Sequence, residues 1–241
     1  STLTTYNRTY DIVLSCTNTI SHLSSLKPFC QLNNCLLLSE KPISYSIDEL
    51  INFPNKDIYL LMNRRYYTWV DFVRDKANNG EISKIVVNLP ERYSDNIVKN
   101  IPRLILENSV HIFDLIYYIS GALAKPSYVS SKKSSMTIIC ESDFINEIIF
   151  NINYDCIEKF SINFYLNDFS RIKAEPIENA YHYTSFKIEK PTSEKYITSY
   201  NPIAYEINPF KSCMKYQKMG VLELCSDLVS CDDLSQTKLP N

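Results

Sequence analysis

The apolar run Cys35-Leu36-Leu37-Leu38 ends directly in Ser39-Glu40-Lys41-Pro42, and this junction constrains the fold more than any other stretch of the sequence. Residues 10–17 form an earlier apolar run, and residues 21–32 between the two runs have the pattern of a helix. Strand, helix and strand in this order predict a parallel sheet, whose strand ends gather at one edge. Open α/β folds bind their ligands at that edge, so the sequence predicts Lys41 at a ligand site.

The same pattern continues up to residue 64. Ser46, with Glu49 three residues later, is a capping box, which predicts a helix after the Glu-Lys-Pro turn. A third apolar run at residues 57–62 then leads into Asn63-Arg64-Arg65-Tyr66. We therefore expect residues 1–64 to form an α/β domain with a partial parallel sheet of about three strands.

The sequence changes character after residue 65. Residues 69–78 and 100–120 have helical periodicity, and residues 82–89 form an apolar run. Alternating apolar and polar runs, which are typical of an antiparallel meander with one face on helices, follow at residues 134–140, 146–154, 160–166, 170–175 and 181–188. We expect residues 65–241 to form an α+β domain with an open, mainly antiparallel sheet flanked by helices, ending in a helix at residues 216–229.

Charge and hydropathy exclude several classes of protein. The 25 basic and 27 acidic residues are well mixed, so no basic stripe predicts binding to nucleic acid or to an anionic membrane. No stretch approaches about 18 apolar residues, and the N-terminus lacks a basic region followed by an apolar one. The sequence thus predicts neither a membrane span nor a signal peptide, and we expect a cytoplasmic protein.

The cysteines and histidines predict neither a disulfide framework nor a metal site. The eight cysteines include no Cys-x-x-Cys pair, and several lie inside apolar runs. This is typical of buried free thiols in a reducing compartment, with disulfides as the less favoured alternative. The three histidines are far apart, so we expect no zinc site.

Four short motifs occur in order over residues 10–121. They are Cys16-Thr17-Asn18 with His22 shortly after it, Glu40-Lys41-Pro42, Asn63-Arg64-Arg65-Tyr66, and a helical segment at residues 107–114 that contains His111. With these motifs the sequence resembles the Gfo/Idh/MocA family, the NAD(P)-dependent oxidoreductases named after glucose-fructose oxidoreductase and inositol dehydrogenase. The resemblance implies that residues 1–64 are the C-terminal portion of a Rossmann-like dinucleotide-binding domain. Residues 65–241 would then be the substrate-binding and oligomerisation domain.

The resemblance also implies roles for the site residues. Hydride transfer between a nicotinamide and a sugar carbinol needs a group that exchanges the hydroxyl proton and a cation that orients the oxygen. Lys41 and His111 are the expected catalytic pair, with Glu107 on the same helix face as His111 to orient the imidazole. The expected cofactor-binding residues are Thr17, Asn18, Glu40, Lys41 and Pro42. The expected substrate-binding residues are Arg64, Arg65, Tyr66 and Asp114.

Each role has a structural alternative that the sequence leaves open. Lys41 can be a solvated surface lysine, and His111 can be a hydrogen-bonded structural histidine. Either arginine of the Asn-Arg-Arg-Tyr motif can pair with an acidic neighbour, and Asp114 can cap or pair nearby. His22, at the start of a helix, fits a packing or capping group better than a catalyst.

The glycine-rich loop that holds a dinucleotide in this family does not occur in the sequence. Gly-x-Gly-x-x-Gly lets backbone N–H groups approach a pyrophosphate at a helix N-terminus. The chain has three glycines, Gly80, Gly121 and Gly220, whereas average usage would give about seventeen. The sequence begins at about the fourth strand of the family pattern. We therefore expect either a fragment or a naturally shortened relative, with weak or absent binding of NAD or NADP by this chain.

Two functions remain open at this point. The favoured one is NAD(P)-dependent hydride transfer to or from a sugar or nucleotide-sugar hydroxyl or carbonyl, similar to family members from surface-polysaccharide sugar biosynthesis. The alternative is a catalytically inactive, truncated relative that serves as a sugar-binding or dimerisation module. The missing glycine loop favours the alternative, whereas Lys41, Glu107 and His111 favour the enzyme. We expect a small-molecule sugar ligand, no nucleic acid or membrane partner, and a homo-oligomer formed through the antiparallel sheet face.

Overall fold

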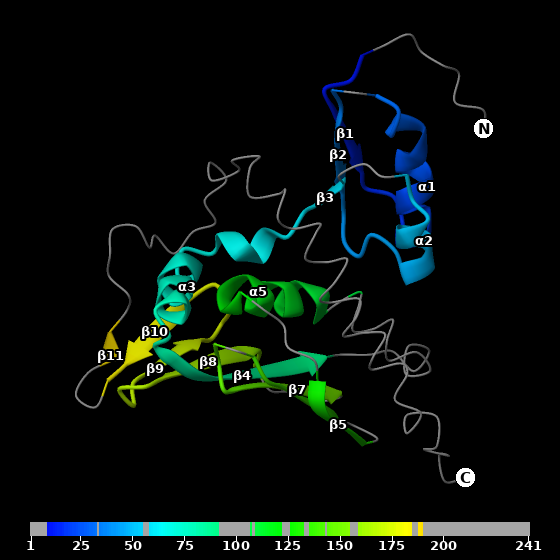
Figure 1. The fold of residues 1–241 in the computed structure, drawn as a ribbon. Coiled ribbons are helices and arrows are strands. Elements are labelled where there is room, and N and C mark those ends of the chain that lie inside the picture. Colours follow the sequence, from blue (N-terminus) through cyan, green and yellow to red (C-terminus); the bar gives the residue numbers. More distant parts are fainter. Residues whose placement is uncertain are drawn as a thin grey trace, which may run out of the picture. The chain divides into compact units, whose positions relative to one another are not determined.

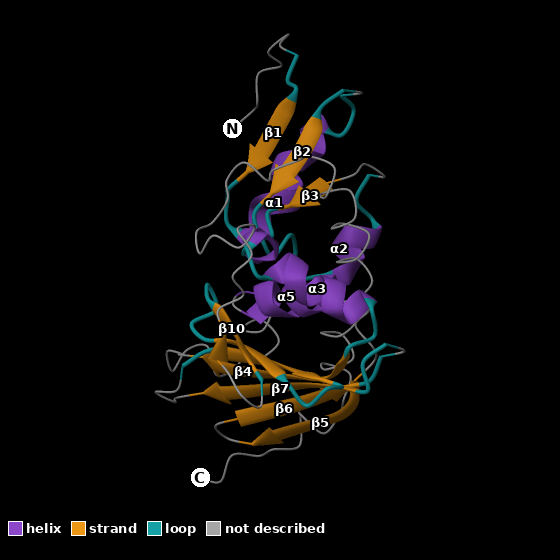
Figure 2. Ribbon diagram, turned by 90° about the vertical axis from the view of Figure 1, so that its left-hand side faces the viewer, coloured by secondary structure: helices purple, strands orange, loops and turns teal. Residues whose placement is uncertain are grey.

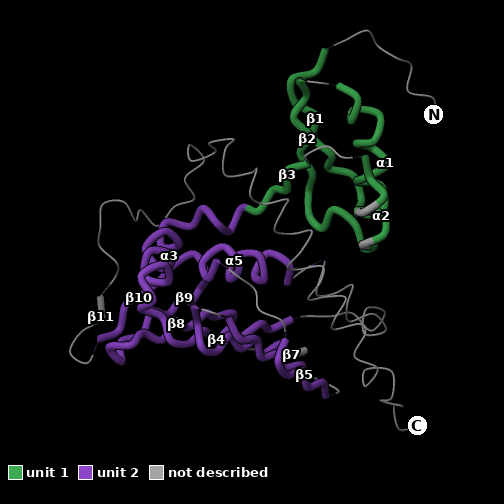
Figure 3. The backbone as a smooth tube through the Cα atoms, viewed as in Figure 1, with its two compact units in different colours: residues 1–62, 207–218 green, residues 63–206, 219–241 purple. Residues whose placement is uncertain are grey.

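The computed structural model describes residues 9–32, 34–54, 58–91, 107, 109–121, 126–132, 135–142, 144–154, 159–184 and 188–189. The chain divides into two compact units, and the first boundary between them lies between Met62 and Asn63 (Figure 3). The sequence placed this boundary after residue 64. The helix expected at residues 216–229 lies outside the described residues.

The first unit contains a three-stranded sheet in the order β1-β2-β3. β1 (Ile12–Ser15), β2 (Leu36–Ser39) and β3 (Ile58–Leu60) all run parallel (Figure 1). Ser15, Ser39 and Leu60 are in register at the C-terminal ends of the strands. The predicted parallel sheet is confirmed, and its three strand ends lie at one edge.

Short helices connect these strands. Residues 21–32, expected to form one helix, contain the end of the 3-10 helix η1 (Thr19–Ser21), then α1 (His22–Leu26) and the 3-10 helix η2 (Lys27–Phe29). Pro28 has no N–H to donate, so it cannot continue the hydrogen bonds of α1, and the chain goes on as η2 after Leu26.

α2 (Ile47–Ile51) begins at the predicted cap, with a modification. The Glu49 N–H donates to Ser46 Oγ at 3.4 Å, as expected. The reciprocal bond passes through Ser44, whose hydroxyl donates to the Glu49 carboxylate at 2.5 Å and accepts from the Ser46 N–H at 3.0 Å. The cap therefore also fixes the turn that follows Pro42.

The second unit is built on an eight-stranded sheet in the order β11-β10-β9-β8-β4-β7-β6-β5 (Figure 2). β4 and β7 are parallel, and every other neighbouring pair is antiparallel. The strands are β4 (Ile82–Glu91), β5 (Pro126–Lys132), β6 (Ser135–Cys140), β7 (Glu147–Tyr154), β8 (Ser161–Leu166), β9 (Arg171–Ala174), β10 (Ala180–Tyr183) and β11 (Ile188–Glu189).

The predicted open, mainly antiparallel sheet is confirmed, but the expected meander order is wrong in one place. β7 and β8 follow each other in sequence, yet β4 lies between them and pairs with both. Ile85, Val87 and Leu89 of β4 are buried, as befits a central strand. Alternation along a strand predicts which residues face the core, but it does not say which strand lies next to it.

Helices α3 (Val70–Asn78) and α5 (Val110–Ser120) lie on one face of this sheet (Figures 1 and 2). The ring centroids of Phe113 on α5 and Phe150 on β7 are 4.4 Å apart, and those of Trp69 and Phe164 are 5.9 Å apart. Because side chains alternate along a strand, the neighbours of Phe150 and Phe164 face away from the helices. Within the described residues, no helix covers that second face, which we call the open face.

The described ranges were searched for membrane-spanning helices and for metal-binding clusters. They contain no helix long and apolar enough to cross a membrane. They also contain no cluster of three His, Cys, Asp or Glu side chains that could hold a metal ion. The cysteines in these ranges, Cys16, Cys30, Cys35 and Cys140, are free thiols.

Candidate functional site

The residues expected to bind a cofactor lie in two loops at one edge of the first unit's sheet. Thr17 and Asn18 follow β1, and residues 40–42 follow β2. Since the strands are parallel and in register, both loops leave the sheet at the same edge. The Glu40 N–H donates to the Ser15 carbonyl at 3.0 Å, which joins the bases of the two loops. The structure therefore brings these five residues together within one unit.

Hydroxyl and amide hydrogen bonds organise the loop after β1. Ser15 Oγ lies 3.2 Å from Thr17 Oγ1 and 2.7 Å from Ser25 Oγ. Asn18 Oδ1 accepts a hydrogen bond from the Ser21 N–H at 3.1 Å and so caps η1. The side-chain oxygen of Asn18 thus serves the local fold, and a cofactor contact would fall to its amide nitrogen.

His22 lies between the two loops. Its ring nitrogen Nδ1 is 2.9 Å from the Pro42 carbonyl oxygen, and Nε2 is 2.7 Å from the Thr17 carbonyl oxygen. His22 is buried, whereas Lys41, joined to Pro42 by a cis peptide bond, is half-buried. The sequence identified His22 as a packing group but missed both contacts, because they join backbone atoms 5 and 20 residues away.

Arg65 and Asp114, both expected to bind substrate, contact each other in the second unit. Arg65 Nε donates to Asp114 Oδ2 at 2.6 Å, and Arg65 Nη2 donates to Asp114 Oδ1. Arg65 is 5% exposed and Asp114 is 2% exposed. Burial raises the pKa of the Asp114 carboxyl, and the hydrogen bonds from Arg65 oppose this shift. Because their polar groups face each other and are buried, we no longer assign either residue to substrate binding.

Tyr118 on α5 extends this cluster. Its ring centroid lies 4.8 Å from the Arg65 guanidinium and 4.3 Å from the Arg74 guanidinium. Arg74 Nη1 also donates to the Tyr118 hydroxyl at 2.8 Å. Cations over an aromatic face are attracted by its electrons, so Tyr118 links α3 and α5 to the Arg65–Asp114 pair.

The remaining residues of the Asn-Arg-Arg-Tyr motif are more accessible. The motif forms the 3-10 helix η3 (Asn63–Tyr66), in which Arg64 and Tyr66 are half-buried. The Arg64 guanidinium lies 5.9 Å from the centroid of the Phe160 ring, and burial lowers its pKa. Burial raises the pKa of the neighbouring Tyr67. Arg64 and Tyr66 therefore stay in the set of candidate substrate-binding residues.

Glu107 and His111 lie around the start of α5, and both are half-buried. α5 begins at Val110, and residues 107 and 109 have π-helical backbone conformation. The expected contact between Glu107 and His111 stays a prediction. Ser109 Oγ donates to the Glu91 carboxylate at 2.7 Å, which ties the start of α5 to the end of β4 and holds His111 on a fixed turn.

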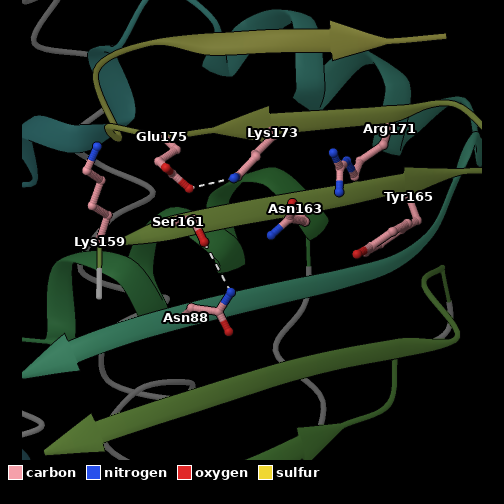
Figure 4. A pocket seen from close by; sticks show the side chains of 8 residues that line it. All are labelled: Asn88, Lys159, Ser161, Asn163, Tyr165, Arg171, Lys173 and Glu175. Carbon is pink, nitrogen blue, oxygen red and sulfur yellow. Dashed lines mark hydrogen bonds and ion pairs between the residues drawn. The ribbon is translucent and has the colours of Figure 1, made fainter. Parts of the chain in front are cut away.

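A polar hollow on the open face of the larger sheet was missed by the sequence analysis. It has a volume of about 410 Å³ (Figure 4). Its lining residues are Asn88, Lys159, Ser161, Asn163, Tyr165, Arg171, Lys173 and Glu175. Polar residues alternate along residues 161–165 and along residues 171–175, but only the pairing of β8 with β9 places the two sets side by side.

No protein-family model and no curated protein matches the sequence. Among solved structures, the chain is similar to the dehydrogenase MviM from Clostridium difficile, with a TM-score of 0.70, 13% identity, and coverage of 91% of this chain and 78% of that chain. It is similar to an oxidoreductase from Thermotoga maritima, with a TM-score of 0.66, 13% identity, and coverage of 91% and 76%. It is also similar to the UDP-N-acetylglucosamine 3-dehydrogenase GnnA from Acidithiobacillus ferrooxidans, with a TM-score of 0.63, 16% identity, and coverage of 90% and 77%.

These neighbours define the class of fold. They include dehydrogenases of the Gfo/Idh/MocA type, in which a Rossmann-like part is followed by a sheet domain. The chain shares the fold of these dehydrogenases, in agreement with the family resemblance of its four motifs. At such low identities the similarity shows the fold alone.

Proposed function

We propose that this protein is an NAD(P)-dependent oxidoreductase that acts on a hydroxyl or carbonyl of a sugar or nucleotide-linked sugar. The observation that carries the proposal is the meeting of the Thr17-Asn18 loop and the Glu40-Lys41-Pro42 turn at the ligand edge of a parallel sheet. The fold shared with solved dehydrogenases supports it, and one of these is a UDP-N-acetylglucosamine dehydrogenase.

The described residues fit the nicotinamide end of a dinucleotide. Thr17 offers a hydroxyl and Lys41 an ammonium, next to each other at the ends of adjacent strands. An ammonium donates hydrogen bonds to ribose hydroxyls, and the Thr17 hydroxyl, which itself donates to the Asn18 carbonyl at 3.3 Å, can accept them. No glycine occurs in residues 1–62, so this part of the chain supplies no glycine loop for the pyrophosphate. We therefore assign these residues to the nicotinamide ribose.

We propose a role for each candidate residue within its own unit. A bound nicotinamide would supply or accept the hydride. Lys41 would donate a hydrogen bond to the substrate oxygen and stabilise negative charge on it. His111 would exchange the hydroxyl proton, and Glu107 would orient the imidazole. Arg64 and Tyr66 would bind polar groups of the sugar or of its nucleotide.

A second function is favoured by the lack of glycine in residues 1–62. In this alternative the protein is a catalytically inactive module that binds a sugar or holds subunits together. Such a module would keep the sheet and lose the dinucleotide. It predicts sugar binding without any transfer of hydride.

We also propose that the second unit forms a homo-oligomer through the open face of its sheet. A row of apolar residues crosses this face: Val86 on β4 is in register with Ile149 on β7, which is in register with Ile139 on β6. Tyr128 on β5 continues the row and is 53% exposed. A second copy of the sheet would remove the exposed part of this apolar row from water.

Polar residues flank the apolar row on both sides. Lys84 pairs with Glu147 on one side. On the other side, Asn151 donates to Asn88 Oδ1 at 3.2 Å, and Asn88 donates to Ser161 Oγ at 3.1 Å. An apolar centre with a polar rim is the usual composition of a protein interface. The hollow in Figure 4 would lie in this rim.

Protection of Cys16 from alkylation tests the proposed cofactor site without relying on turnover. Cys16 is exposed and directly precedes Thr17. NAD(P)H or nicotinamide mononucleotide at this edge should slow the alkylation of Cys16, read by mass spectrometry of its peptide. The half-buried Cys30 is the internal control. Unchanged labelling of Cys16 at saturating ligand would contradict the site, and protection without any hydride transfer would favour the inactive module.

A further inference from the structure

We infer that His22 is a positioning residue that holds the two loops of the ligand edge in a fixed relation. The contacts are in the first unit alone: Nε2 lies 2.7 Å from the Thr17 carbonyl oxygen, and Nδ1 lies 2.9 Å from the Pro42 carbonyl oxygen. His22 is 1% exposed, so water does not compete for either contact. The consequences for the loops' chemistry rest on the proposed function, whereas the contacts themselves do not.

Both hydrogen-bond partners of the His22 ring are carbonyl oxygens. A carbonyl oxygen only accepts hydrogen bonds, so each ring nitrogen must carry a proton to bond to its partner. A neutral imidazole has one N–H and would turn a lone pair toward the second carbonyl. Both ring nitrogens lie within hydrogen-bond distance of a carbonyl oxygen, at 2.9 and 2.7 Å, so one rigid ring contacts both loops.

The positions of the two carbonyls explain why this tie matters. One belongs to Thr17, whose hydroxyl we assign to the nicotinamide ribose. The other belongs to Pro42, the residue directly after Lys41. Fixing both carbonyls therefore fixes the spacing between the Thr17 hydroxyl and the Lys41 backbone, although His22 itself touches neither cofactor nor substrate.

The backbone of His22 is held in turn by the elements around it. The Ser25 hydroxyl donates to the His22 carbonyl at 2.8 Å and lies 2.7 Å from Ser15 Oγ at the end of β1. Asn18 caps the preceding turn through the Ser21 N–H. The His22 backbone is thus held by hydrogen bonds, and its ring contacts both loops. These two properties distinguish a positioning residue from a side chain that only fills space.

Isosteric variants separate the two ends of the tie. An asparagine places its amide nitrogen near the position of the imidazole Nδ1, and a glutamine places its amide nitrogen near the position of Nε2. His22→Asn should keep the bond to Pro42 and lose the bond to Thr17, His22→Gln should do the reverse, and His22→Leu should lose both. His182→Gln is the matched control, since His182 bonds to Ser170 Oγ at 3.0 Å in the second unit.

Hydrogen–deuterium exchange with mass spectrometry reads the two loops separately. We expect amide exchange of residues 16–18 to rise about tenfold in His22→Asn while residues 40–43 stay unchanged, with the opposite result in His22→Gln. Alkylation of Cys16 should accelerate in the Asn variant only. Equal loosening of both loops in both variants, no loosening in either, or loss of the first unit's fold in all three variants would overturn the inference.

Steady-state kinetics supply a second readout that depends on the proposed function. His22→Asn should raise the KM for the dinucleotide about tenfold and leave kcat within about twofold, because only the Thr17 loop is released. His22→Gln should lower kcat about tenfold, because Lys41 follows Pro42. If the variants show the expected exchange pattern but the wild type transfers no hydride, the positioning role of His22 is supported and the proposed oxidoreductase activity is contradicted.

Discussion

Arg65 and Asp114 lie 49 residues apart in sequence and form a buried ion pair with two hydrogen bonds. The pair joins η3 to the first half of α5, the helix that also carries His111. A carboxylate and a guanidinium that face each other in this way are specific in geometry as well as in charge. The pair therefore fixes the turn that carries Arg64 and Tyr66 relative to α5.

Breaking this pair should destabilise the protein strongly. Arg65→Met leaves the Asp114 carboxylate buried without its partner, and we expect the free energy of unfolding to fall by about 3–5 kcal/mol in chemical denaturation. Adding Asp114→Leu should restore most of the loss. Lys76→Met is the control, because Lys76 pairs with Glu81 at 2.5 Å near the surface, and we expect a change below about 1 kcal/mol. A similarly small change for Arg65→Met would contradict the structural role of the pair.

The acid/base role of His111 predicts a loss of turnover with an intact fold. His111→Ala should lower kcat for hydride transfer by about 10²-fold or more, the usual effect of removing a positioned acid/base group. Glu107→Gln should lower kcat less, since the amide still orients the ring by hydrogen bonding. His182→Ala, in β10, should leave kcat within about twofold. Near-normal turnover of His111→Ala would make this histidine structural.

Cys140 should be unreactive in the folded protein. It is buried in β6, and burial raises the pKa of its thiol from 9.0 to about 12. Because the thiolate is the reactive form, a thiol reagent at neutral pH should label the exposed Cys16 and label Cys140 only after unfolding. Fast labelling of Cys140 without denaturant, in peptide-resolved mass spectrometry, would show that β6 opens locally.

The raised pKa of Cys140 makes the stability of the fold depend on pH. The Cys140 pKa is higher in the folded than in the unfolded chain, so its contribution to stability is present below about pH 9 and is lost as the pH rises through the folded value. Between about pH 8 and pH 10, wild type should therefore lose more stability than Cys140→Ala, measured by urea denaturation at each pH. An equal loss in both proteins would contradict the shift.

The open sheet face should control the oligomeric state. Ile149→Asp places a charge in the centre of the apolar row, and burial of an unpaired carboxylate in an interface is unfavourable. We expect this variant to be monomeric in analytical ultracentrifugation at concentrations where wild type associates. Phe144→Asp, at a residue that is 65% exposed outside the row, should associate as wild type does. A monomeric wild type would rule out the proposed oligomer.

The sequence predicted the elements around the ligand edge because they depend on local patterns. The apolar run before Glu40 and the Ser46 cap each follow from residues a few positions apart, and both occur in the structure. The five residues of the two loops also met as expected, since parallel strands end at one edge. The strands, the helix cap and the positions of the two loops could therefore be predicted from the sequence.

The remaining features depend on contacts between residues far apart in sequence. Nothing near Asp114 indicates that its partner is Arg65, and nothing near His22 indicates the Pro42 carbonyl. The insertion of β4 between β7 and β8 is likewise a matter of pairing, which alternation does not specify. The π-helical turn at residues 107 and 109 was hidden because an apolar stripe predicts an α-helix by default.

Transfer of deuterium from the nicotinamide to a sugar carbon would establish the proposed activity. The protein would be incubated with NAD(P)H deuterated at nicotinamide C4 and a panel of keto-sugars and nucleotide-linked keto-sugars, and the sugar products analysed by mass spectrometry. We predict that label passes to a sugar carbon in wild type and that the rate falls by about 10²-fold or more in Lys41→Ala. Binding of a sugar without any transfer of label, or an unchanged rate in Lys41→Ala, would contradict the account.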